Sequence, residues 1–140
     1  MAIRQSILIV DDYTPNLISL EAILENSAWT LRKAHSGIEA LEILRQEEVS
    51  LVLLDVQMPE MNGFEVADVI RKNKQLQYLP IIFLSAVHRD DKSIARGYEV
   101  GGVDYLCKPL NPFILKAKVD FFMKSDRIRR ELMQQAKNPS

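Results

Sequence analysis

Apolar residues follow two alternating patterns along the chain. Short, uninterrupted apolar runs are typical of strands buried on both faces of a parallel sheet. Between these runs, apolar residues recur every three or four positions, as on one face of a helix. The runs predict strands over residues 6–10, 29–34, 51–55, 80–85 and 103–107. The second run mixes apolar and charged residues, which favours a place at the sheet edge.

Five helical patterns alternate with these strands. They begin near residues 14, 36, 62, 90 and 111, and the first, third and fourth are expected to end near residues 26, 73 and 100. Thr14 is a natural N-cap with Pro15 at the first helical position, Ser36 and Glu39 have capping-box spacing, and Asn62 could cap the third helix. The alternation predicts an α/β domain: a five-stranded parallel sheet with helices on both faces and right-handed crossovers.

Composition narrows the class of protein. The 140 residues are enough for one domain and too few for two. A formal net charge of -1 argues against nucleic-acid binding, and no apolar run reaches the length of a membrane span. No signal peptide is expected before the first strand. The single cysteine, Cys107, cannot form an internal disulfide, which fits a cytoplasmic protein.

Polar residues that could take part in a reaction follow four of the five strands. Asp11 and Asp12 follow the first strand, Asp55 ends the third, Ser85 ends the fourth and Lys108 follows the fifth. Because the carboxyl ends of parallel strands lie along one edge of the sheet, we expect these side chains to converge there.

Three neighbouring carboxylates repel one another. At about 4 Å and an effective dielectric near 20, each pair costs roughly 4 kcal/mol before screening, so at least one pKa should rise in the absence of metal. Mg²⁺ would relieve this repulsion and would bridge to phosphate oxygens. The Lys108 ammonium and the Ser85 hydroxyl could bind other phosphate oxygens, leaving Asp55 as a nucleophile that forms an acyl phosphate.

These residues together resemble a known family, the receiver domains of two-component response regulators and hybrid kinases. The resemblance covers residues from about 3 to 124. It is carried by the Asp11-Asp12 pair, the run from Leu53 to Gly63 around Asp55, Ser85, Tyr105 and Lys108-Pro109. It implies a flavodoxin-like fold with strand order 2-1-3-4-5 and a cis Lys108–Pro109 bond.

The resemblance also implies roles for individual residues. Asp55 would be phosphorylated by a phosphohistidine on a sensor histidine kinase or histidine phosphotransfer protein. The Mg²⁺ ligands would be Asp11, largely through water, Asp12, Asp55 and the main-chain carbonyl of Gln57. Ser85 and Tyr105 would relay the signal to the surface of the fourth helix, fifth strand and fifth helix, where an unknown downstream protein binds. Such a domain assists its own phosphorylation and dephosphorylation and is otherwise no enzyme.

Two other functions fit parts of the pattern. An aspartyl phosphatase of the haloacid dehalogenase type would carry a second acid two residues after Asp55, where this chain has Gln57. A pseudo-receiver, a binding scaffold without phosphate control, would usually lack one of the acids or the lysine. The acids and the lysine are all present here, which argues against a pseudo-receiver. It stays as the alternative to a phosphorylation-controlled module.

The last helix is expected to extend beyond the end of the domain. A receiver would end near Lys124, giving a domain over residues 1–124, but no proline or glycine occurs between Phe113 and Asn138. We predict a helix to about Gln135 within an extension over residues 125–140, whose end is disordered. Phe121, Ile128 and Leu132 share a short stripe with coiled-coil spacing, which favours a weak homodimer; the alternative is a frayed, solvated helix end.

Overall fold

A single parallel sheet forms the centre of the molecule. The computed structural model describes residues 3–86 and 91–137. The strands are β1 (Gln5–Val10), β2 (Trp29–Ala34), β3 (Leu51–Asp55), β4 (Ile81–Ser85) and β5 (Asp104–Cys107), in the order β2-β1-β3-β4-β5. All neighbouring pairs are parallel. The predicted strand order is confirmed, and β2, with its partly exposed side chains, is the predicted edge strand.

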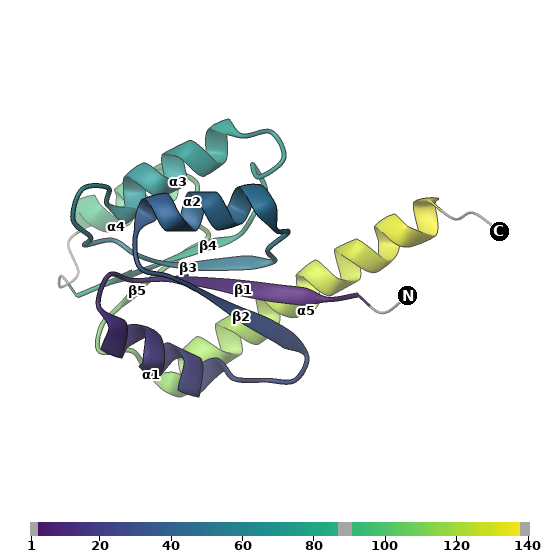
Figure 1. Ribbon diagram of the computed structural model, residues 1–140, viewed down its shortest axis with the longest axis horizontal. Helices are drawn as coiled ribbons and strands as arrows, with labels where there is room; N and C mark the ends of the chain where they lie inside the picture. Colours follow the sequence, from purple (N-terminus) through teal and green to yellow (C-terminus); the bar gives the residue numbers. More distant parts are fainter. Residues whose placement is uncertain (1–2, 87–90, 138–140) are drawn as a thin grey trace.

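Helices cover both faces of the sheet (Figure 1). They are α1 (Thr14–Leu24), α2 (Gly37–Gln46), α3 (Gly63–Lys72), α4 (Asp91–Glu99) and α5 (Pro112–Lys137). Figure 1 shows α1 and α5 on one face and α2, α3 and α4 on the other. Of residues 3–86 and 91–137, no helix is both long and apolar enough to cross a bilayer.

The central strand β3 explains why its sequence is an unbroken apolar run. Leu51 and Leu53 belong to the core cluster under α1 and α5, whereas Val52 and Leu54 belong to the cluster under α2 and α3. All four side chains are fully buried, because successive residues of a strand point to opposite faces and helices cover both faces here. Two cores therefore fix the position of the next residue, Asp55.

The start of α1 differs from the prediction. Thr14 is the first helical residue rather than the N-cap, and Tyr13 occupies the cap position without a side-chain bond. The Tyr13 N–H donates to Asp11 Oδ1 at 2.9 Å, so the turn after β1 is set by Asp11 and the helix starts one residue earlier than predicted. The helix also ends at Leu24, before the predicted end near Asn26, because Glu25 leaves helical geometry.

The capping box predicted at α2 is incomplete, and a complete capping box occurs at α3 instead. Ser36 accepts the Glu39 N–H at 3.1 Å, but the Glu39 carboxylate lies 3.6 Å from His35 Nδ1. The complete capping box occurs at α3, where the Asn62 side chain accepts the Glu65 N–H at 2.9 Å and the Glu65 carboxylate accepts the Asn62 N–H at 3.0 Å. This box starts α3 eight residues after Asp55.

Candidate functional site

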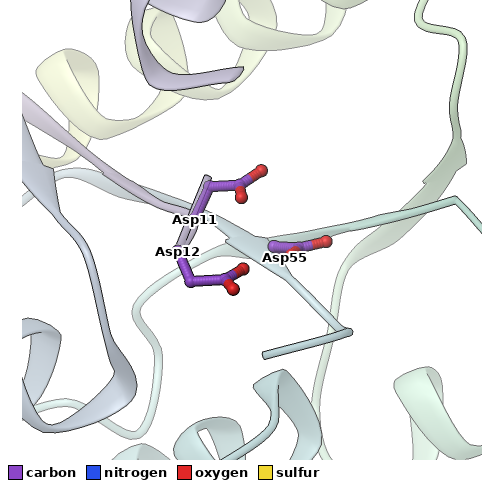
Figure 2. Close-up of side chains that lie close together, drawn as sticks. All are labelled: Asp11, Asp12 and Asp55. Carbon is purple, nitrogen blue, oxygen red and sulfur yellow. The ribbon is translucent and has the colours of Figure 1, made fainter. Parts of the chain in front are cut away.

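The predicted acids meet at the carboxyl ends of β1 and β3. Asp55 is the last residue of β3, and both it and Asp11 are almost fully buried, whereas Asp12 is exposed. Each side chain offers an oxygen within 4.8 Å of the others. Figure 2 shows the three carboxylates gathered beyond the strand ends. The convergence expected from the sequence is therefore present.

Lys108 joins the two buried acids. Its Nζ donates to Asp11 Oδ2 at 3.0 Å and to Asp55 Oδ1 at 3.3 Å. The Lys108 N–H donates to the Ser85 carbonyl at 2.7 Å, which fixes the start of the loop after β5, and the Lys108–Pro109 bond is cis as predicted. Three carboxylates and one ammonium leave two negative charges, which matches the charge of a divalent cation.

Asp11 is held as a supporting residue. Its Oδ1 accepts the Tyr13 N–H, and its Oδ2 accepts both Asn16 Nδ2, at 2.9 Å, and Lys108 Nζ. These three bonds engage both oxygens of Asp11, whereas Asp12 and Asp55 keep oxygens free for a ligand. The role of Asn16 was not anticipated, because nothing in the spacing shows that the first turn of α1 brings this amide back to the strand end.

The pKa of Asp55 is raised to about 6. Burial is the largest cause, and the charge of Asp11 adds to it, while the charge and hydrogen bond of Lys108 oppose it. The raised pKa was expected from the crowding of acids, but the dominance of burial comes from the two helix layers around β3. Asp55 is thus mostly ionised at neutral pH, but at a cost in stability.

The Gln57 side chain covers the donors beside Asp55. Its amide lies against Ser85 Oγ, with Nε2 at 3.0 Å and Oε1 at 3.2 Å. Gln57 Oε1 also accepts the Ala86 N–H at 3.2 Å. A hydroxyl and a main-chain N–H next to a carboxylate nucleophile are the groups that would bind phosphoryl oxygens. No pattern in the sequence predicts this side-chain contact.

Comparison with known proteins places this site in a family. The family model of the response regulator receiver domain matches residues 7–120. The chain belongs to this family. Receiver domains serve two-component systems, so phosphorylation-based signalling is the function of this class of domain.

Curated relatives of the receiver domain are longer proteins. A probable cyclic di-GMP phosphodiesterase of Vibrio cholerae is 38% identical over 131 residues, covering 93% of this chain and 29% of that protein. The transcriptional regulatory protein GltR of Pseudomonas aeruginosa is 35% identical over 120 residues, covering 86% and 49%. The chain thus spans less than half of the length of these two relatives.

Solved structures show the same fold. The receiver domain of an HD domain-containing protein from Pseudomonas fluorescens Pf-5 superposes with a TM-score of 0.81 and 28% identity, covering 89% of this chain and 98% of that one. A CheY-like receiver domain from Methanospirillum hungatei JF-1 gives a TM-score of 0.80 and 27% identity over 91% and 99%. The match extends over nearly the whole of each solved domain, which confirms the flavodoxin-like, CheY-like class.

Tyr105 lies apart from the acids of this receiver domain. It pairs with Phe83 in the sheet register, two residues before the position opposite Ser85. Its ring centroid lies 6.3 Å from that of Phe83, which in turn packs edge-on against Phe64 at 5.1 Å. Its half-buried ring therefore belongs to an aromatic layer between the sheet and α4.

Proposed function

We propose that Asp55 is the phosphoacceptor of this receiver domain and that its donor is a phosphohistidine on a sensor histidine kinase or histidine phosphotransfer protein. One observation carries the assignment. Of the three clustered acids, Asp55 alone combines a buried position at the end of the central strand with a free carboxylate oxygen and contact with Lys108.

The transfer is a displacement at phosphorus. A carboxylate oxygen of Asp55 attacks the phosphorus atom, the phosphorus–nitrogen bond of the phosphohistidine breaks, and its electron pair stays on the imidazole nitrogen. The Lys108 ammonium pairs with a phosphoryl oxygen. The Ser85 hydroxyl and the Ala86 N–H donate to another once the Gln57 amide has moved away, so Lys108 and Ser85 are the assisting residues.

The donor set fits Mg²⁺. It contains only oxygen ligands and a net charge of two negative units, which suits a small, hard cation. Asp12, Asp55 and the main-chain carbonyl of Gln57 would hold the ion, with Asp11 acting through water because both of its oxygens already accept hydrogen bonds. When bound, the ion neutralises charge on the phosphoryl oxygens.

The response would leave the domain through α4, β5 and α5. Ser85 contacts the site and Tyr105 lies two residues before its sheet neighbour, so these two residues would act as the switch. The receiver unit would span residues 1–124, and residues 125–140 would form a C-terminal extension that continues the last helix and closes with a short tail. Its partner would be a downstream protein in the cytoplasm. The receiver domain itself would not bind nucleic acid or membrane directly, and it would assist no reaction beyond its own phosphorylation and dephosphorylation.

Acetyl phosphate tests the assignment directly. Incubation of the full chain with acetyl phosphate and Mg²⁺ should add one phosphoryl group to the intact mass, and chelation of the metal should prevent it. Asp55→Asn should abolish the increase, whereas Asp120→Asn, a change at an exposed aspartate on α5, should leave it unchanged.

Two results would contradict the proposal. An undiminished mass increase in Asp55→Asn would place the phosphoryl group elsewhere. No increase in the wild type, either with acetyl phosphate or with a phosphorylated histidine phosphotransfer protein, would favour the pseudo-receiver alternative.

A further inference from the structure

The outward face of α5 carries an unbroken seam. Its positions are separated alternately by three and four residues, as in a coiled coil, and comprise Lys118, Phe121, Ser125, Ile128, Leu132 and Gln135. Phe121 is 64% exposed, Ile128 46% and Leu132 59%, so roughly half of the surface of these large apolar side chains is open to solvent. Around its centre lies a shallow, mostly apolar groove that also includes Arg129, Met133 and Ala136.

The opposite face of α5 fixes the helix to the domain. Asp126 is buried and accepts Gln5 Nε2 at 3.0 Å and Arg130 Nε at 2.7 Å. Gln5 also donates to the Met123 carbonyl, and Arg130 Nη1 pairs with Glu48 at 2.7 Å. Burial favours a higher pKa for Asp126, but hydrogen bonds from Gln5 and Arg130 outweigh it and lower that pKa. The part of α5 that follows Asp126, residues 127–137, forms an arm whose direction is therefore fixed by the domain.

Figure 1 shows this arm extending past the end of the sheet, so its outer side is not covered by its own domain. A helix already held straight loses little conformational freedom when it pairs, which favours association. We propose that the seam binds the same seam of a second copy in antiparallel orientation, so that each arm covers Phe121 of the other copy.

The side chains fit this register. In an antiparallel pair, Phe121 faces Leu132 of the second copy and Ile128 faces Ser125, so each large residue meets a different residue rather than itself. Lys118 faces Gln135 at the two ends, and the Lys118 ammonium is already paired with Asp104 of its own chain. The two Ile128–Ser125 layers thus occupy the centre, the apolar Phe121–Leu132 layers flank them, and the polar layers lie at the ends.

Charge decides the orientation. Antiparallel helices place flanking Lys124 beside Glu131 of the second copy, and symmetry produces this favourable pair twice. Parallel helices would instead place Lys124 beside Arg129 of the second copy, where like charges repel. A second copy in antiparallel orientation is therefore a charge-complementary occupant of this surface.

Sedimentation of the full chain tests both the surface and the orientation. The wild type should dimerise in the micromolar range, and Ile128→Glu/Leu132→Glu should raise the dimer dissociation constant by at least a hundredfold. Lys124→Glu should raise it roughly three- to tenfold through two repulsive pairs with Glu131. Lys124→Glu/Glu131→Lys should restore it, and Lys116→Glu, on α5 but outside the seam, should leave it unchanged.

Results that contradict the proposal distinguish between a wrong surface and a wrong orientation. A wild type that stays monomeric at about a millimolar, or a dimer that persists in Ile128→Glu/Leu132→Glu, overturns the proposed surface. A dimer that tightens in Lys124→Glu overturns the antiparallel orientation, since that change would pair residue 124 with Arg129 of a parallel copy. Circular dichroism of each variant confirms that the fold is intact, as expected for exposed positions.

Discussion

Asp55→Asn should stabilise the metal-free protein at neutral pH and leave its stability almost unchanged at acidic pH. The pKa of Asp55 rises from an ordinary value of 3.8 to about 6 in the folded state. The folded state therefore binds more protons than the unfolded state between these values. Folding is favoured below the lower pKa, and this contribution is lost as pH rises through about 6.

The magnitude follows from the shift. About two pKa units at roughly 1.4 kcal/mol each correspond to about 3 kcal/mol, the free energy of ionising Asp55 inside the folded protein. Asparagine has almost the same shape but no charge, so it avoids this cost. The pKa of about 6 already includes the opposing attraction of Lys108, which keeps Asp11 as a partner in the variant, so the gain at neutral pH should be ~1–3 kcal/mol.

Urea unfolding measures the effect. Wild type and Asp55→Asn should be compared with a chelator present, at pH values below 4 and at about 7.5, because the comparison at each pH cancels the titration of groups that do not interact with Asp55. A gain of this size should raise the melting temperature by about 3–10 °C for a chain of this length. Asp120→Asn is the control for loss of an exposed aspartate.

Two outcomes of the urea unfolding experiment would refute a charge-based stabilisation. A stabilisation that is equal at acidic and neutral pH would show that charge is not its cause, and a less stable variant at neutral pH would contradict the raised pKa. Mg²⁺ provides an independent check, because binding to the folded state should stabilise the wild type much more than Asp55→Asn.

Three further changes have definite expected outcomes. Gln57→Ala should speed phosphorylation by acetyl phosphate severalfold, measured as the initial rate of mass increase, because it removes the bonds that hold the Gln57 amide against the Ser85 hydroxyl and the Ala86 N–H, each being worth ~0.5–1.5 kcal/mol. Asn62→Ala should lower the free energy of unfolding by about 1 kcal/mol through loss of the α3 capping box. Gly63→Ala should lower it by ~1–3 kcal/mol, since a Cβ there would lie 2.4 Å from the Asp55 carbonyl oxygen; both losses are measured by urea unfolding.

The fold was predictable because each strand has its own local signal. The run Leu51–Asp55 needed only its own composition to be placed between two helix layers, and the topology rules for α/β sheets then brought Asp11 and Asp12 to the same edge. The strand order came from the family resemblance rather than from the pattern. Helix starts were less certain because competing caps lie side by side, and at α1 the bond from Tyr13 to Asp11 decided against Thr14.

Contacts between residues far apart in sequence could not be predicted in this way. The Gln57 amide meets Ser85 only because β3 and β4 are neighbours and end at the same level, and no spacing rule states where a long side chain points after a strand ends. The bond from Gln5 to Asp126 joins residues 121 positions apart. A buried acid within a helix of polar composition has the same sequence signal as an exposed one.

The site and the α5 arm are connected by the chain itself. Lys108 touches both buried acids and lies only four residues before α5 starts at Pro112. A phosphoryl group on Asp55 would draw the ammonium away from Asp11, so the change in charge is applied directly to the segment that leads into α5. Because Asp126 holds the far half of the helix against Gln5 on β1, α5 is fixed near both ends of the sheet. Displacement of the Lys108 segment would therefore tilt a rigid helix rather than bend a flexible one, and the seam on its outer face would move with it.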